Sequence, residues 1–153
     1  MRVRPRILLQ SHVDRAGHTR DCLGDLEQFE ETEHWHSRDA FLREARGRLA
    51  QGEHVYTRVE EGVLLGWIWL IDRQKRAYLS DVAQYYDFDQ DSAVIYGSYV
   101  HPMARGRGLY RKGVEKAVYD AVQDPSTSVV HTAIVPSNAA PIRVVESIGF
   151  TLK

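Results

Sequence analysis

The stretch VHPMARGRGLYRKGVEKAV, residues 100–118, decides the fold because it predicts a strand that enters a helix through a glycine-rich turn. The run AVIYGSYVH (93–101) is rich in Tyr and Val and is followed by Pro102, which is typical of a strand and its end. From residue 109, apolar side chains recur on one face of a helix that stops before Pro125. This order of elements is the general layout of a site that binds phosphate.

The turn before the helix contains glycines and positive charges, and neither is favoured at the start of a helix. Gly106 and Gly108 weaken a helix, and four basic side chains crowd the positive end of the helix dipole: Arg105, Arg107, Arg111 and Lys112. We therefore expect an anion at this turn. On the turn alone, two other interpretations stay open: an arginine-glycine segment that binds RNA, and a tight connection whose arginines are only solvated.

Two common phosphate-binding motifs are excluded by residue type. A dinucleotide fingerprint requires a third glycine three residues after Gly108, where the chain has Arg111. A P-loop requires Lys and then Ser or Thr after its last glycine, and neither Gly108 nor Gly113 is followed by that pair. The expected anion therefore belongs to another class of ligand.

The composition is that of an ordinary soluble protein, and we expect one domain over residues 1–153. Its net charge of −1 argues against a protein that binds nucleic acid through bulk electrostatics. Cys22 is the only cysteine, which excludes an internal disulfide and favours a reducing cytoplasm. The apolar run from Ile7 to Leu9 is too short for a signal peptide or a membrane span, so we predict a cytoplasmic protein without a membrane partner.

Two helical segments are predicted in the first third of the chain. A candidate first strand at 6–10 is followed by residues 14–31, which place two leucines and a phenylalanine at helical spacing. Ser37 is a good N-cap for a second helix, and Gly52 lies just past its end.

The pattern then changes to the period of two that strands show. Residues 54–60 and 63–71 predict an antiparallel hairpin closed by a turn at Glu61-Gly62. Residues 72–92 predict a short strand near Tyr78-Leu79 followed by a loop.

The chain after residue 125 predicts one more strand and one more helix. The run 128–135 predicts a buried strand, and Asn138 caps a helix that stops at Gly149. The predicted order is therefore β-α-α-β-β-β-α-β-α. It describes an α+β fold, a three-layer α/β sandwich in which helices flank a mixed, mostly antiparallel sheet.

Two motifs resemble those of the GCN5-related N-acetyltransferases, the GNAT family. The run Arg105-Gly106-Arg107-Gly108 after the strand ending in VHP is similar to the family's acyl-CoA-binding motif, Arg/Gln-x-x-Gly-x-Gly/Ala. The segment NAAPIRVVESIGF, 138–150, is similar to a second signature, an asparagine that opens a helix ending in Gly-Phe. The resemblance covers residues 53–150 well. It implies a GNAT-like fold and acyl transfer from acetyl-CoA or another acyl-CoA.

The resemblance also implies roles for single residues. Backbone N–H groups of residues 105–110 hold the cofactor diphosphate, and the pantetheine arm lies in a slot between strands 93–101 and 128–135. The N–H of Val100 polarises the thioester carbonyl, so Val100 is the catalytic candidate. Asn138 contacts the arm or is a plain N-cap. The cofactor-binding candidates are Tyr99, Val100, Arg105, Gly106, Arg107, Gly108, Leu109, Tyr110 and Asn138, and no metal ligand is predicted.

The chain departs from the family pattern at three points. Tyr110 replaces the small residue that ends the turn motif, so its ring either points away from the phosphates or reshapes the pocket. Val145 stands where a tyrosine usually protonates the departing thiolate, and strand 93–101 has no acidic residue to act as the base. The base stays open among these candidates: a water chain, Tyr96, Tyr99, His101 or an acid from residues 72–92.

Three further features have a structural and a functional interpretation. Trp67 and Trp69 share one side of a strand, which favours core packing over an acceptor platform. Residues 72–92 mix acidic and aromatic side chains, which favours a solvated loop over an amine-binding surface. His34 and His36 favour a polar loop over a metal site.

Family members usually continue after Gly-Phe with one or two strands, which this chain lacks. We therefore expect missing or truncated C-terminal strands and an open edge at 128–135. Either a second copy of the chain covers this edge as a homodimer, or the sequence is a truncated piece of a longer chain. The leading hypothesis is an acetyl-CoA-dependent N-acyltransferase that acylates an amine of a small molecule or sugar. The alternative is a non-catalytic acyl-CoA-binding or sensor domain, which the missing acid and base favour.

Overall fold

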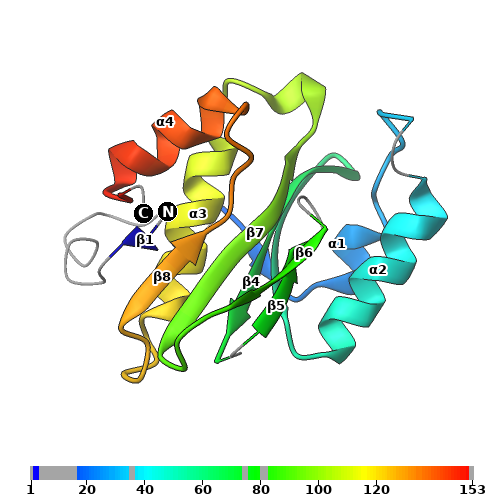
Figure 1. Ribbon diagram of the computed structural model, residues 1–153. Coiled ribbons are helices and arrows are strands. Elements are labelled where there is room, and N and C mark those ends of the chain that lie inside the picture. Colours follow the sequence, from blue (N-terminus) through cyan, green and yellow to red (C-terminus); the bar gives the residue numbers. More distant parts are fainter. Residues whose placement is uncertain (1, 4–16, 35–36, 74–75, 80–82, 152–153) are drawn as a thin grey trace.

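The computed structural model describes residues 2–3, 17–34, 37–73, 76–79 and 83–151 (Figure 1). The elements follow the chain in this order: β1 (Arg2–Val3), β2 (Thr19–Arg20), α1 (Leu23–Leu26), α2 (Arg38–Ala50), β3 (His54–Glu60), β4 (Val63–Asp72), β5 (Arg76–Leu79), β6 (Gln84–Asp87), β7 (Ser92–Val100), the 3₁₀ turn η3 (Pro102–Ala104), α3 (Leu109–Ala121), β8 (Val129–Thr132) and α4 (Ala139–Ile148).

The main sheet of the described residues has the strand order β1-β8-β7-β4-β3-β2, and β5 and β6 form a separate hairpin. The pairing between β7 and β8 is parallel, and the other pairings are antiparallel. Helices α3 and α4 cover one face of the sheet and α1 and α2 the other (Figure 1). The predicted fold class, a mixed α+β sheet flanked by helices, is confirmed.

The capping and turn predictions for the middle of the chain are confirmed. The Ser37 hydroxyl accepts a hydrogen bond from the Ala40 N–H (3.3 Å), and Gly52 follows the helix with a left-handed backbone, φ 83°. Glu61 and Gly62 both have positive φ, 51° and 78°, which suits the tight turn between β3 and β4.

The helix expected over 14–31 is wrong for the residues that the structure describes there. Its helical part is the single turn α1, and β2 precedes it. The break is at Asp21, whose φ is 55°. The Asp21 N–H donates to the Val55 carbonyl (2.8 Å) and its carboxylate accepts from the Val55 N–H (2.9 Å), so the segment is bound along β3. Leu26 is still fully buried. The strand expected at 6–10 lies outside the described residues.

The second strand of the hairpin in 72–92 was missed by the sequence pattern. All four residues of β6 are exposed, so no buried face marks it with alternating hydrophobicity. Its partner β5 buries Ala77 and Leu79 and was expected near that place. Trp67 and Trp69 are 7% and 2% exposed, which makes both of them core residues.

The edge of the sheet at β8 is paired within the chain, which corrects the expected open edge. Arg2 lies opposite His131 and Val3 opposite Val130 in an antiparallel register. Among the described residues, no helix has the length and apolar character needed to cross a lipid bilayer.

Candidate active site

Strands β7 and β8 separate part way along the sheet. Their parallel pairing runs from Ser92 opposite Val129 to Ile95 opposite Thr132, and the Ala133 N–H donates to the Ile95 carbonyl (3.2 Å). Beyond this point β7 continues to Val100 without β8 beside it. The two strands therefore form a fork, which begins a few residues before the position expected from the sequence.

A bulge in β7 lies inside this fork. The register with β4 shifts between Trp67, opposite Tyr99, and Trp69, opposite Tyr96, so β7 contains one extra residue. Gly97 lies in the bulge with φ 57°, and a Cβ there would be 2.9 Å from Arg48 Nη1 and 3.3 Å from the Trp69 ring. Glycine suits both this backbone and this crowded space. In the sequence 93–101, Gly97 is the one residue that indicates the bulge.

The bulge places the backbone of Val100 toward the fork. The His101 N–H donates to the Leu65 carbonyl of β4 (2.8 Å), and the Tyr99 carbonyl also faces β4, where a Cβ on Gly66 would be 2.9 Å from it. Because successive peptide groups of a strand point in opposite directions, the N–H and carbonyl of Val100 face away from β4. Tyr99 was predicted to bind the cofactor, but its carbonyl is directed at β4.

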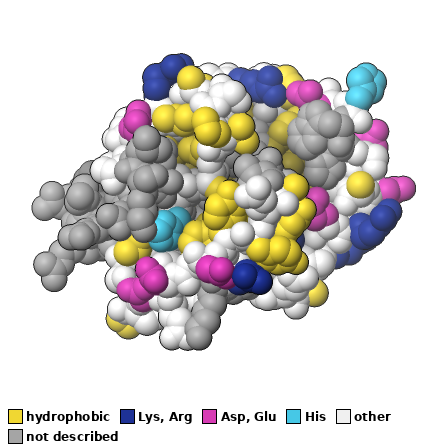
Figure 2. Space-filling view, viewed as in Figure 1, with side chains coloured by type: hydrophobic (Ala, Val, Ile, Leu, Met, Phe, Trp, Pro, Cys, Tyr) yellow, Lys and Arg dark blue, Asp and Glu magenta, His cyan; other side chains and the backbone are white. Residues whose placement is uncertain are grey.

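A cavity of about 750 Å³ opens at the end of the fork, between β7, α3 and α4. Its walls include every site residue predicted from the sequence except Arg107: Tyr99, Val100, Arg105, Gly106, Gly108, Leu109, Tyr110 and Asn138. Arg111, one of the four basic residues expected near an anion, also lines it, whereas Ser98, Ala104 and the α4 residues in its walls were missed by the sequence reasoning. Figure 2 shows Lys and Arg side chains along the upper edge of the molecule, over α4 and the loop between β7 and α3.

The glycine-rich turn offers bare backbone to this cavity. Gly106 and Gly108 have left-handed φ angles of 79° and 74°, and a Cβ on either would meet no atom within 4 Å. Helix α3 begins directly after Gly108, no side chain caps it, and its first turn has no acidic residue. Open space in front of uncapped N–H groups fits an anion such as a diphosphate.

The arginines of the turn have different partners. Arg107 points out of the cavity to Glu60, with N–O distances of 2.7 and 3.0 Å, and Arg107 together with Arg58 lowers the pKa of the Glu60 carboxyl. Arg105 lies in the cavity wall, donates to the Val100 carbonyl (3.3 Å) and contacts Glu33 (3.4 Å). Only the side chain of Arg105, of these two, is placed toward the fork.

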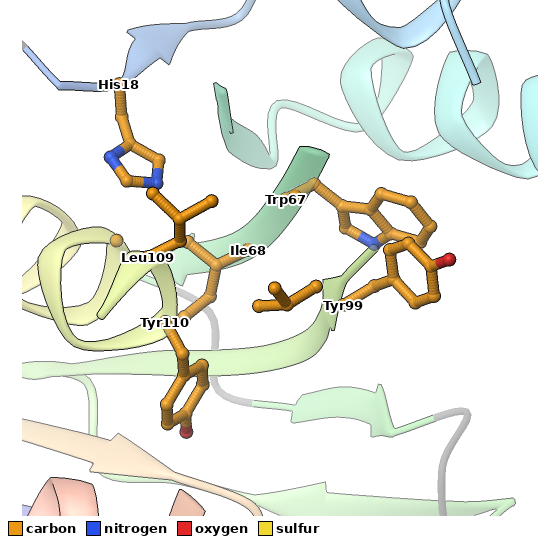
Figure 3. A pocket seen from close by; sticks show the side chains of 9 residues that line it. His18, Trp67, Ile68, Tyr99, Leu109 and Tyr110 are labelled. Carbon is orange, nitrogen blue, oxygen red and sulfur yellow. The ribbon is translucent and has the colours of Figure 1, made fainter. Parts of the chain in front are cut away.

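The ring of Tyr110 points from α3 toward β8 (Figure 3). Burial raises the pKa of Tyr110 to about 12, against the opposing effect of hydrogen bonds to Thr132 and Ser98. The hydroxyl thus connects β8 and β7 at the fork. Of the two orientations expected from the sequence, the ring takes the one that leaves the glycine turn clear.

Asn138 opens the second motif, and Val145 lies inside its helix. The Asn138 side chain makes no capping hydrogen bond and lies exposed in the cavity wall, which favours a ligand contact over a plain N-cap. Val145 is completely buried in the core under α4. No phenol is therefore available at the position of Val145.

Two of the candidate bases, Tyr96 and His101, lie away from the cavity. The Tyr96 hydroxyl donates to Glu53 Oε2 (2.5 Å), and burial raises the pKa values of both groups. His101 accepts from the Met103 N–H at Nδ1 (3.2 Å), and its Nε2 lies 3.8 Å from Glu30. Neither Tyr96 nor His101 lines the cavity. Glu53 was missed because a single charged residue before a strand gives no sequence signal of burial.

Tyr99 joins the cavity to the segment between α1 and α2. Its ring stacks on Trp67 with centroids 4.5 Å apart, and its hydroxyl hydrogen-bonds to Thr32. The same segment contributes Glu33 to Arg105 and Glu31 to the Arg38 N–H (2.6 Å). Acidic side chains therefore lie beside the outer end of β7.

Comparison with known proteins gives a family and a set of similar folds. The model of a family described as the acetyltransferase (GNAT) family matches residues 20–150. No curated protein sequence matches the chain. The solved structure of yncA from Salmonella typhimurium, with its cofactor acetyl-CoA, is 28% identical with a TM-score of 0.55. That match covers 77% of this chain but only 61% of yncA.

Two aminoglycoside acetyltransferases are similar in fold over most of their length. AAC(6′)-Iy, in complex with the bisubstrate analogue CoA-S-monomethyl-acetylneamine, has a TM-score of 0.60 and 19% identity, over 85% of this chain and 84% of that one. The 6′-N-acetyltransferase AAC(6′)-IG from Acinetobacter haemolyticus has a TM-score of 0.63 and 15% identity, over 89% and 91% of the two chains. At these identities the likeness concerns the fold.

Proposed function

The chain belongs to the acetyltransferase (GNAT) family, and from this premise we propose that it transfers an acetyl group from acetyl-CoA to an amine of a small molecule or sugar. The observation that carries the proposal is the cavity at the β7–β8 fork. Its walls contain the uncapped start of α3, the two turn glycines with free space in front of them, and the backbone of Val100. Diphosphate and thioester are the two groups of acetyl-CoA that need such partners.

The residues present fit the cofactor in three places. The N–H groups of the turn 105–110 and the start of α3 suit the diphosphate, with Arg105 as the charged partner. The fork beyond Ile95 leaves strand backbone unpaired for the amides of the pantetheine arm. Asn138 supplies a side-chain amide on the other wall.

The reaction is direct attack of the amine on the thioester. The amine lone pair forms the C–N bond, and the carbonyl oxygen becomes an oxyanion that the Val100 N–H stabilises. The oxyanion then collapses, the C–S bond breaks, and the thiolate of CoA leaves with the bonding electrons. The nitrogen releases one proton and the thiolate takes one up, so the products are an amide and the free thiol.

Tyr110 is the proposed source of the proton for the thiolate. Its hydroxyl lies at the fork, and a phenol with a pKa of about 12 stays protonated at neutral pH. This hydroxyl would protonate the departing thiolate, which Val145, a buried residue without a proton donor, cannot do. A thiolate is a moderate base, so we expect the donor to raise the rate without being indispensable.

On the amine side, Tyr99 is the proposed relay to solvent. Among the side chains considered as base, it lines the cavity, whereas Tyr96 and His101 do not. Glu31 and Glu33 flank Thr32, whose hydroxyl hydrogen-bonds to the Tyr99 hydroxyl, and we expect this acidic segment to favour a positively charged amine as the acceptor. The structural relatives AAC(6′)-Iy and AAC(6′)-IG are named for acetylation of aminoglycosides, which are amines of sugars.

The test is release of free thiol from acetyl-CoA across a panel of amines, amino sugars and peptides. We expect thiol release with at least one cationic small amine, dependent on enzyme concentration. A second candidate function, an acyl-CoA sensor without catalysis, is favoured by the absence of a phenol at Val145. Binding of acetyl-CoA without thiol release for any acceptor would support the sensor and contradict the transferase.

A further inference from the structure

Helix α2 places the side chain of Arg48 against the bulge in β7. The guanidinium carbon lies 4.8 Å from the centroid of the Tyr96 ring on β7 and 5.0 Å from that of the Trp69 ring on β4. A Cβ on Gly97 would be 2.9 Å from Arg48 Nη1, so the guanidinium lies against the bulge where glycine leaves space for it. Trp69 and Tyr96 lie opposite each other on one side of the register shift. Arg48 therefore contacts both strands at the point where β7 has its extra residue.

Arg48 is itself held by contacts at both ends of the residue. Its guanidinium donates to the carboxylate of Glu44 one turn earlier in α2, and the side chain is only 13% exposed. Its carbonyl accepts from the Glu53 N–H (3.1 Å), and the Glu53 carboxylate accepts from the Tyr96 hydroxyl (2.5 Å). The Tyr96 ring is thus fixed by Arg48 over its face and by Glu53 at its hydroxyl. A cation is attracted most strongly to aromatic rings where water is largely excluded, as it is here.

The bulge determines which way the residues after it face. Tyr96 and Tyr99 are three residues apart, an odd interval at which the side chains of a regular strand point to opposite faces. Both nevertheless pack in the same hydrophobic cluster, where the Tyr99 ring stacks on Trp67 (Figure 3). Without the extra residue, every group after Tyr96 would be turned to the opposite side, and the N–H of Val100 would face β4 instead of the fork. Gly97 also permits an ordinary strand backbone, so glycine alone does not hold the bulge.

We propose that Arg48 is a positioning residue that holds the bulge and thereby keeps the Val100 N–H directed at the fork. This role rests on the proposed function, in which the Val100 N–H binds the thioester carbonyl, and adds to it a residue outside the cavity walls. An apolar side chain in place of Arg48 would fill the space but would lose the attraction to both rings and the bond to Glu44. The planar guanidinium suits contact with two rings at once.

The test is infrared spectroscopy of bound acetyl-CoA that carries ¹³C at its thioester carbonyl. A hydrogen bond from the Val100 N–H weakens the C=O bond and lowers its stretching frequency, and the measurement requires no acceptor. We expect a higher carbonyl frequency in Arg48→Met than in wild type, both at saturating acetyl-CoA, because methionine fills the space without the charge. A carbonyl band at the wild-type position in Arg48→Met would overturn the inference.

Calorimetry with CoA, which lacks the thioester carbonyl, separates positioning from general support of the site. We expect Arg48→Met to bind CoA within about twofold of wild type, since Arg48 does not line the cavity. Loss of CoA affinity by about tenfold or more would overturn the inference, because Arg48 would then support the whole site and not the carbonyl position.

Arg46→Met is the matched control. Arg46 lies in the same helix, but its side chain is 57% exposed and pairs with Glu27 (3.3 Å). We expect the wild-type carbonyl band and the wild-type CoA affinity in this variant. A carbonyl shift in Arg46→Met equal to that in Arg48→Met would contradict the specific role of Arg48.

Arg48→Lys covers the case in which Arg48→Met does not fold. Lysine keeps the charge, but its ammonium is not a plane that contacts both rings. We expect a smaller shift of the carbonyl band in the same direction with CoA affinity retained, and in that case a wild-type band would overturn the inference. Failure of the proposed function looks different, because the wild-type protein then binds neither CoA nor acetyl-CoA, which contradicts the role of Arg48 as well.

Discussion

Gly106 and Gly108 have the same left-handed backbone as Gly97 but the opposite surroundings. A Cβ on Gly97 would collide with Arg48, whereas a Cβ on Gly106 or Gly108 would project into open space. Gly97 therefore lies in a crowded part of the bulge. At Gly106 and Gly108, glycine suits the left-handed φ angle and leaves free space in front of the backbone, where a ligand can bind.

Replacement of Gly108 by leucine should remove cofactor binding. The side chain would enter the cavity in front of α3, and we expect acetyl-CoA affinity to fall at least about tenfold in calorimetry. Leucine at φ 74° also costs about 1 kcal/mol of stability, because L-residues disfavour this backbone.

Gly52→Leu is the control for backbone strain. Gly52 has φ 83°, faces open space and lies outside the cavity walls. This variant should lose a similar amount of stability and retain acetyl-CoA binding. If both leucine variants bind acetyl-CoA equally well, the turn does not contact the cofactor.

Tyr110→Phe tests the hydroxyl at the fork. We expect the rate of acetyl transfer to fall by about tenfold to a hundredfold with little change in acetyl-CoA affinity, since the proton donor is lost and the ring remains. Loss of the hydrogen bonds to Thr132 and Ser98 should lower the free energy of unfolding by about 1 kcal/mol. Tyr119→Phe, on the same helix but outside the cavity, should retain wild-type turnover. An equal rate for Tyr110→Phe and wild type would exclude Tyr110 as the donor.

The sequence predicted the positions of the site residues but not the orientation of their side chains. The positions followed from the turn motif, because its glycines are needed for left-handed φ angles. The orientation of Tyr110 depends on Ser98 and Thr132, two residues far apart in the chain that only the folded sheet brings together. Similarly, Glu53 and Tyr96 gave no separate signal, because their pairing exists only between β7 and the start of β3.

At the scale of elements, the turn between β7 and α3 is connected to two other parts of the fold. Arg105 contacts Glu33 of the segment between α1 and α2, and Arg107 contacts Glu60 at the end of β3. The two arginines are close in sequence, but their side chains contact different parts of the fold. Arg105 also contacts the Val100 carbonyl, so it connects the turn to the proposed carbonyl site.

Comparison of Arg105→Ala with Arg107→Ala tests this division. We expect Arg105→Ala to weaken CoA binding by about tenfold in calorimetry, because a charged hydrogen bond to the diphosphate is lost. Arg107→Ala should leave CoA affinity within about twofold of wild type, since its side chain contacts Glu60 outside the cavity. A larger effect for Arg107→Ala than for Arg105→Ala would contradict the assignment.

The burial of Glu53 predicts a pH dependence of stability. Burial raises the pKa of Glu53 above its value of 4.5 in the unfolded chain. The folded state therefore favours the protonated form. The stability that Glu53 contributes is present below pH 4.5 and is lost as the pH rises through the raised pKa of the folded state.

Glu53→Gln removes this titration and keeps an acceptor for the Tyr96 hydroxyl. In urea unfolding from about pH 4.5 to pH 7, the variant should become more stable relative to wild type as the pH rises. Glu146→Gln, an exposed change on α4, should show no such trend. A parallel pH profile for wild type and Glu53→Gln would contradict the raised pKa.

Long periodic elements were predictable and irregular ones were not. Helix α2, the hairpin of β3 and β4, and helices α3 and α4 each bury a continuous apolar face, so their pattern reports their structure. The segment before α2 follows contacts to β3 through Asp21, and β6 is exposed on both faces. Neither of those has a local pattern that indicates its structure.

At the scale of the whole molecule, the sheet separates the large cavity from the acidic segment between α1 and α2. The cavity that we propose as the cofactor site lies on the face covered by α3 and α4, and the acidic segment between α1 and α2 lies beside the other end of Tyr99. The fork and the bulge in β7 are where the two sides meet. This arrangement supports a reaction in which acetyl-CoA and the amine approach from different sides.

The proposed homodimer loses the argument on which the sequence based it. Strand β1 pairs with β8 at Val130 and His131, so that edge is covered by the chain itself. Light scattering after size exclusion decides between the two states. A stable monomer at micromolar concentration would contradict the dimer, and a mass of two chains would require an interface other than the β8 edge.

The most direct test of the account is a crystal structure of the protein with acetyl-CoA. We predict the diphosphate at the backbone N–H groups of residues 105–110, the pantetheine arm in the β7–β8 fork, and the thioester oxygen within hydrogen-bond distance of the Val100 N–H. Acetyl-CoA bound at any other place, or with its thioester oxygen away from Val100, would contradict the account.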